Sequence, residues 1–174
     1  MSKTYRIIVA THKQFQMPED KDLYIPIQVG SEGKEDLGYQ PDNQGVHISH
    51  LNHYYCELTG LYWAWKNLEC DYLGLVHYRR YFTSKRHSYR EVISMDDIIL
   101  SKSEVKNLLS KYDVVVPKKR KYYIETLYSH YAHTHDANHL DVTRQIVSEL
   151  RPDYIVAFDQ VMKQRSGYMF NMFI

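Results

Sequence analysis

The sequence predicts an α/β fold with a mostly parallel sheet flanked by helices, and three observations predict this class. Short apolar runs at residues 5–10, 71–76 and 114–116 have the length and β-branched content of buried strands. Between them, apolar residues from Leu51 to Trp65 recur at spacings of three and four, the period of a helix face. Strands and helices therefore alternate along the chain, which is the order of a parallel sheet with covering helices.

The elements expected in the first half are one strand, one loop and one helix. Residues 5–10 form a strand because the run is too short for a helix. Residues 30–45 are rich in Gly, Asp, Gln and Asn and predict an irregular loop, and loops of this length in small domains are often functional. A helix then begins at Ser49 or His50, and Ser49 is the better N-cap because its hydroxyl can accept a backbone hydrogen bond.

The second half is expected to alternate in the same way. After the strand at 71–76, a helix is predicted from Met95 to Ser110, with Ser94 as its N-cap and acidic residues in its first turn. A third strand follows at 114–116. One or two helices are expected within 124–150 and another within 154–165. There are no internal repeats, so the length of 174 residues predicts a single domain, residues 1–174.

Composition excludes several classes of protein. A net charge of +1 gives no electrostatic reason to expect a nucleic-acid partner. The basic run Lys118–Lys121 predicts a solvated loop, with peripheral contact to an anionic membrane as the open alternative. Cys56 and Cys70 form no close-paired motif, which is typical of a reducing compartment. With no signal peptide and no apolar window of about 18 residues, we expect a cytoplasmic protein, at most peripheral to the inner face of the membrane.

Polar side chains gather where the predicted strands end. His77, Arg79 and Arg80 follow the strand at 71–76, and Thr11 and His12 follow the first strand. The carboxyl ends of strands in an open α/β sheet hold ligand-binding groups, and guanidinium groups bind phosphate oxygens in a bidentate manner. We therefore expect a site for a doubly negative group.

The two arginines also allow a structural interpretation. Successive strand residues point to opposite faces, so only one of Arg79 and Arg80 is expected to face the crevice. One of them could instead bridge to Glu57 or Asp71 and hold the helix to the strand. Both interpretations stay open at this point.

The chain resembles a known family in several blocks. The blocks Asp42-Asn43-Gln44-Gly45, ELTGLYWAWKN at 57–67 and HYRRYF at 77–82 resemble the DUF4422 family, bacterial glycosyltransferase-like proteins of capsule, exopolysaccharide and O-antigen synthesis. The resemblance runs from residues 7–13 to residues 167–174. It implies a GT-A-like nucleotide-sugar-binding fold.

The resemblance also implies an activity. The partners would be a nucleotide sugar, UDP-linked, and a glycan or lipid-linked acceptor, with galactose or galactofuranose as the candidate hexosyl units. Family members usually continue for several tens of residues beyond the last shared block, so we expect a C-terminally truncated chain. A non-catalytic protein that binds sugar nucleotides or glycans is therefore the alternative.

Further site candidates lie in the shared blocks. Asp42, Asn43 and Asn52 could bind ribose or sugar hydroxyls, although such residues also stabilise turns through their own backbone. Glu57 is a candidate catalytic base beside Arg79, with an exposed and paired carboxylate as the alternative.

Metal chemistry receives little support from the sequence. Neither Asp96-Asp97 nor the isolated Asp136, Asp141, Asp153 and Asp159 form a DxD motif, so no cofactor is predicted and a divalent metal stays open as an addition to the arginines. His135 and His139 would share a helix face, as zinc ligands can, but the glutamate of HExxH is absent. The resemblance implies a Tyr-x-x-x-His step, matched by Tyr131 and His135. We expect no metal ligands here and take His135 as a second catalytic candidate on the acceptor side; a metallohydrolase is the remote third hypothesis.

Overall fold

The computed structural model describes residues 3–83 and 94–174, and these form two compact units. The first unit takes the chain up to Val116 together with Asn171–Ile174, and the second unit is Pro117–Phe170. Each unit is described separately. The prediction of a single domain stays a prediction.

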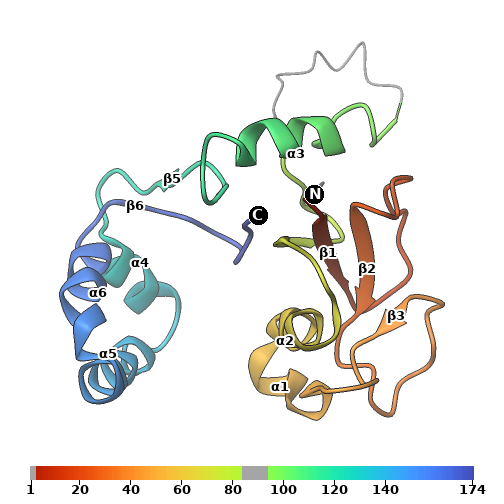
Figure 1. Ribbon diagram of the computed structural model, residues 1–174. Coiled ribbons are helices and arrows are strands. Elements are labelled where there is room, and N and C mark those ends of the chain that lie inside the picture. The colour runs from red at the N-terminus through yellow and green to blue at the C-terminus, as the bar shows by residue number, and fades with distance from the viewer. Residues whose placement is uncertain (1–2, 84–93) are drawn as a thin grey trace. The chain divides into compact units, whose positions relative to one another are not determined.

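The first unit is built on a four-stranded sheet in the order β3-β2-β1-β4, and Figure 1 labels β1, β2 and β3 of this sheet. Its strands are β1 (Tyr5–Thr11), β2 (Tyr24–Gln28), β3 (Gln40–Pro41) and β4 (Tyr72–His77). Every adjacent pair is parallel, with Ile8 of β1 opposite Ile25 on one side and Leu75 on the other. The predicted α/β class with a mostly parallel sheet is confirmed. All four strands therefore end at the same edge of the sheet.

An apolar layer covers each face of this sheet because successive side chains of β1 point to opposite sides. Ile7 and Val9 belong to the cluster that includes Val105 and Leu109 of α3 (Lys102–Leu109). Ile8 and Ala10 belong to the cluster on the other face, with Trp63 and Ala64 of α2 (Leu58–Asn67). Close approach of α2 requires Gly60, since a Cβ there would lie 2.7 Å from the Val29 Cγ1 atom.

The helix expected from Ser49 through the periodic residues up to Trp65 is interrupted. It forms as η1 (Ser49–Leu51), α1 (Asn52–Tyr55) and α2, and the break lies at Cys56, which has a left-handed φ of +47°. The predicted N-cap at Ser49 is also wrong, because its side chain makes no cap bond and donates to Asp42 instead.

Two further boundaries differ from the prediction. The helix expected from Met95 forms only as α3, whose N-cap is Ser101 in a capping box with Glu104; Ser94 instead bonds Asp97 in a separate turn. The strand expected at 114–116 is also wrong as a sheet strand. Its central residue, Val115, exchanges two backbone hydrogen bonds with Ile174, of 2.8 and 2.9 Å.

The second unit is helical, as predicted for its sequence. It contains α4 (Leu127–Thr134), α5 (Asn138–Leu150), η2 (Pro152–Tyr154) and α6 (Ile155–Met162), with β5 (Arg120–Lys121) antiparallel to β6 (Ser166–Gly167) (Figure 1). Arg144 of α5 binds Asp159 of α6 through two hydrogen bonds of 2.7 Å. Among the described helices, none has the length and apolar character needed to cross a membrane.

Candidate functional site

A pocket of about 510 Å³ lies at the edge where the parallel strands of the first unit end. It brings together six residues predicted for the site: His12, Asn52, Glu57, His77, Arg79 and Arg80. The remaining lining residues are Ala10, Val29, Lys34, Cys56 and Tyr78. Residues that follow β1, β2 and β4 therefore meet the α1–α2 junction around one cavity.

A turn after β4 directs both arginines to this pocket. The Arg80 amide donates to the His77 carbonyl at 2.8 Å, and the His77 amide donates to the Arg80 carbonyl at 3.3 Å. Arg79 and Arg80 are both exposed and both line the cavity. The expectation that only one would face the crevice is wrong, because strand alternation no longer applies in the turn.

Tyr78 supports two of the polar groups. Its side chain is buried, and the Arg79 guanidinium carbon lies 5.1 Å from the centre of its ring. The His12 ring meets the same tyrosine edge-on at a centroid distance of 5.3 Å. A cation over an aromatic face is a favourable arrangement, so the ring limits the positions that Arg79 adopts.

Asp42 is fully buried and does not line the pocket. Its carboxylate accepts hydrogen bonds from the backbone amides of Gly30 and Ser31, at 2.8 and 3.0 Å, and from the hydroxyls of Ser31, Ser49 and Thr59. Burial alone would raise the pKa of Asp42, but these donors outweigh it and hold the pKa below its ordinary value. The direct ligand contact predicted for Asp42 does not fit this geometry; the residue ties the 30–31 loop to η1 and α2.

Asn52 lines the pocket from the start of α1. Its amide nitrogen donates to the Cys56 carbonyl at 2.7 Å and to the Thr59 hydroxyl at 3.0 Å. Gly30 lies against the same side chain with a φ of +59°, and a Cβ there would come within 2.3 Å of the Asn52 Oδ1 atom. Glycine is therefore required for this contact.

Two other predicted residues lie outside the lining. Thr11 is buried, and its hydroxyl donates to the Lys13 carbonyl at 2.6 Å. Asn43 is half-buried and is not among the residues that line the pocket. Neither position fits direct contact with a ligand held in this cavity.

Glu57 lines the pocket immediately before α2. One of its oxygens, Oε1, accepts a hydrogen bond of 2.8 Å from the Asn171 side chain. Asp71, the other carboxylate considered as an arginine partner, accepts from the backbone and hydroxyl of Thr4 at 2.6 and 2.9 Å. Both carboxylates therefore have partners other than the arginines.

His135 belongs to the second unit. It follows α4 and lines a separate cavity there, where its ring lies 4.6 Å from that of Tyr131. The hydroxyl of Tyr131 lies 3.1 Å from the Nδ1 atom of His139.

One group within the described residues could hold a metal ion. Ligand atoms of Glu32, His47 and His50 all lie within 4.8 Å of one another. The Glu32 amide donates to the Ser49 hydroxyl, which itself donates to Asp42, so the buried carboxylate brings the Glu32 loop and η1 together. Two imidazoles and a carboxylate are a ligand set that zinc accepts. The sequence analysis missed the group because Glu32 comes from a different segment than His47 and His50, and the three residues match no spacing motif.

Comparison with known proteins gives one family and one solved structure. The family model described as "Domain of unknown function (DUF4422)" matches residues 6–174. No curated protein matches the sequence. The apo structure of WbbM, a bifunctional glycosyltransferase, is similar with 27% identity and a TM-score of 0.83. The match covers 98% of this chain and 33% of that one, so the chain corresponds to about a third of that enzyme.

Proposed function

The chain belongs to the DUF4422 family, and from this premise we propose that it is a glycosyltransferase of surface polysaccharide synthesis. It takes a hexosyl unit from a nucleotide sugar, UDP-linked, and transfers it to a glycan or lipid-linked acceptor. The similarity to a bifunctional glycosyltransferase supports this class of reaction. Galactose and galactofuranose remain the donor sugars that we propose, and the cytoplasmic face of the membrane remains the proposed location.

The observation that carries the proposal is the cationic pocket at the carboxyl edge of the sheet. Arg79, Arg80 and Lys34 all line it, and such edges are where open α/β sheets bind nucleotides. The two guanidinium groups bind the diphosphate and stabilise the negative charge that develops on it as it leaves. Lys34, in the long loop, adds a third cation that was not among the residues predicted for the site.

Glu57 is our candidate for the catalytic base. In the transfer step, the bond between the anomeric carbon and the diphosphate oxygen breaks, and a bond to the acceptor hydroxyl oxygen forms. The proton of that hydroxyl must pass to a base, and the second oxygen of Glu57 can accept it while Asn171 holds the first.

The test is UDP binding by an Arg79→Ala variant, measured by calorimetry. Loss of a charge-assisted hydrogen bond of about 1.5–3 kcal/mol corresponds to a roughly 10- to 150-fold weaker affinity. Arg151→Ala is the matched control, because Arg151 is exposed and lies in the second unit. Unchanged UDP affinity in Arg79→Ala would contradict the proposed site.

A second measurement separates the enzyme from its alternative. Glu57→Gln should bind UDP like the unaltered protein but transfer no sugar. If the unaltered protein binds a nucleotide sugar and transfers it to no glycan or lipid-linked acceptor, the chain is a sugar-nucleotide-binding protein.

A further inference from the structure

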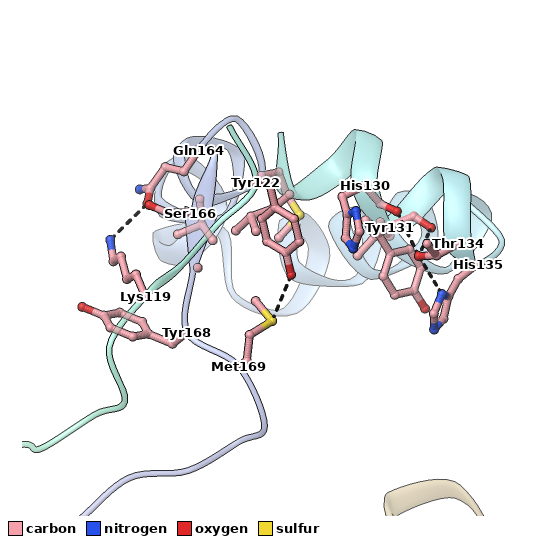
Figure 2. A pocket seen from close by; sticks show the side chains of 15 residues that line it. Lys119, Tyr122, His130, Tyr131, Thr134, His135, Gln164, Ser166, Tyr168 and Met169 are labelled. Carbon is pink, nitrogen blue, oxygen red and sulfur yellow. Dashed lines mark hydrogen bonds between the residues drawn. The ribbon is translucent and has the colours of Figure 1, made fainter. Parts of the chain in front are cut away.

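The second unit contains a cavity of about 500 Å³, shown in Figure 2. Its lining differs in kind from that of the pocket in the first unit. Five of its lining residues have aromatic or imidazole rings with polar atoms: Tyr122, Tyr131, Tyr168, His130 and His135. Apolar side chains from α4, α5 and α6, including Leu127, Leu140 and Val161, form the rest. A concave, mostly apolar cavity with a few converging polar groups is typical of a small-molecule site.

The rings are held in place by their neighbours. The Tyr122 ring lies 4.2 Å from that of His130, and the Tyr122 hydroxyl contacts the Met169 sulfur at 3.2 Å (Figure 2). Tyr131 and His135 form a similar pair, with their ring centres 4.6 Å apart. Aromatic faces that are positioned before a ligand arrives lose little side-chain entropy on binding.

One ring nitrogen of His130 is hydrogen-bonded to a residue that does not line the cavity. Its Nδ1 atom lies 2.8 Å from Glu125, which also bonds His133. These hydrogen bonds lower the pKa of Glu125, so the residue is a carboxylate at neutral pH. The contact leaves Nε2 as the ring nitrogen for a ligand, and a hydroxyl group, being both donor and acceptor, can bond it in either protonation state.

The cavity has a single lysine or arginine in its lining. Lys119 donates to the Gln164 side chain at 3.2 Å and lies 5.0 Å from the centre of the Tyr168 ring (Figure 2). The cavity thus lacks paired guanidinium groups such as those that line the first pocket. The polar atoms around it are amide, hydroxyl and imidazole groups, which hydrogen-bond neutral hydroxyls.

We propose that this cavity binds a pyranose ring of a glycan. The C–H bonds on one face of a pyranose ring form an apolar surface that packs on tyrosine. The hydroxyls around the edge of the ring can form hydrogen bonds with His130, His135 and Gln164. Identification of this sugar as part of the acceptor rests on the proposed glycosyltransferase function. Binding of the sugar itself does not.

The experiment is saturation-transfer NMR on the full chain without a nucleotide, with methyl glycosides of glucose, galactose, mannose and N-acetylglucosamine as probes. We expect at least one glycoside to bind, and Tyr168→Ala to weaken its affinity about three- to tenfold, the range of an aromatic contact. Tyr168→Phe, which keeps the ring, should retain it. Tyr154→Ala is the matched control, because Tyr154 is 54% exposed and Tyr168 is 55% exposed, and each lies beside a cation.

Two results would overturn the inference: no glycoside binds, or Tyr154→Ala weakens binding as much as Tyr168→Ala. Farnesyl phosphate is the competing probe, and its binding at Tyr168 in place of every glycoside would assign the cavity to an isoprenoid chain instead. A UDP titration of the same variants keeps the two proposals apart. Glycoside binding without UDP binding refutes the proposed function and preserves this inference. UDP binding without glycoside binding refutes this inference and preserves the proposed function.

Discussion

The two cavities have nearly the same volume, about 510 Å³ in the first unit and about 500 Å³ in the second, but their linings differ in kind. The first presents Arg79, Arg80 and Lys34 where parallel strands end. The second presents tyrosine and histidine rings that lie in α4 or follow α4, β5 and β6. Volume alone therefore says little about a ligand: the lining suits a charged diphosphate in one unit and an uncharged sugar in the other.

Each cavity has a nearby carboxylate that holds its surroundings in place, and the two carboxylates differ in burial and in hydrogen-bond partners. Asp42 beneath the first is fully buried and surrounded by five donors, whereas the Glu125 side chain beside the second is 31% exposed and bonds two histidines. Water screens an exposed pair, so its contribution to stability is small, while an altered group in a buried network leaves donors unpaired. Loss of the Asp42 carboxylate should therefore destabilise the first unit far more than loss of the Glu125 carboxylate destabilises the second.

The largest expected effect is that of Asp42→Asn. The amide accepts through one oxygen only and brings an NH₂ group among donors, which should lower the free energy of unfolding by about 2–4 kcal/mol. Urea unfolding measures this change. UDP binding should also weaken, because the 30–31 loop loses its tie, while glycoside binding in the second unit should persist.

Glu125→Gln is the control for that variant and should change the urea midpoint little. Equal destabilisation by the two substitutions would remove the distinction between the buried and the partly exposed carboxylate.

A smaller effect is expected on acidification. The pKa of Asp42 is lowered in the folded chain, so its stabilisation is complete above the unfolded value of about 4 and is lost as the pH falls through the folded value. The free energy of unfolding should therefore decline below about pH 4 more steeply in the unaltered protein than in Asp42→Asn. Parallel pH profiles of the two proteins would show that another group is responsible.

Chelation should have the smallest effect. With arginines facing the diphosphate, EDTA is expected to leave both UDP and glycoside affinities unchanged, as calorimetry can measure. UDP binding that EDTA abolishes, that manganese restores and that His50→Ala removes would instead assign the metal to Glu32, His47 and His50.

The fold was largely predictable because its main signals are local. The apolar run at Tyr5–Ala10 and the periodicity of the aromatic helix need no long-range information to be recognised. The break at Cys56 does need it, since the apolar spacing continues across the break. What marks the break in the structure is the Asn52 side chain, which caps the Cys56 carbonyl and reaches Thr59.

The site was predictable to the extent that parallel strands dictate it. His12, His77, Arg79 and Arg80 come together because their strands end at one edge. The position of Asp42 was not predictable, because its donors come from residues 7 to 17 positions away along the chain. A carboxylate in a polar loop gives no signal in the sequence that it will be buried.

Cys56 gives the first cavity a natural reporter. Its thiol is exposed and lies in the pocket lining, whereas burial raises the pKa of the other free thiol, Cys70. Alkylating reagents attack the thiolate, so at neutral pH they modify Cys56 first. A nucleotide bound at the proposed site should shield that sulfur, so that the rate of alkylation would measure occupancy without a radiolabel or an assay of turnover.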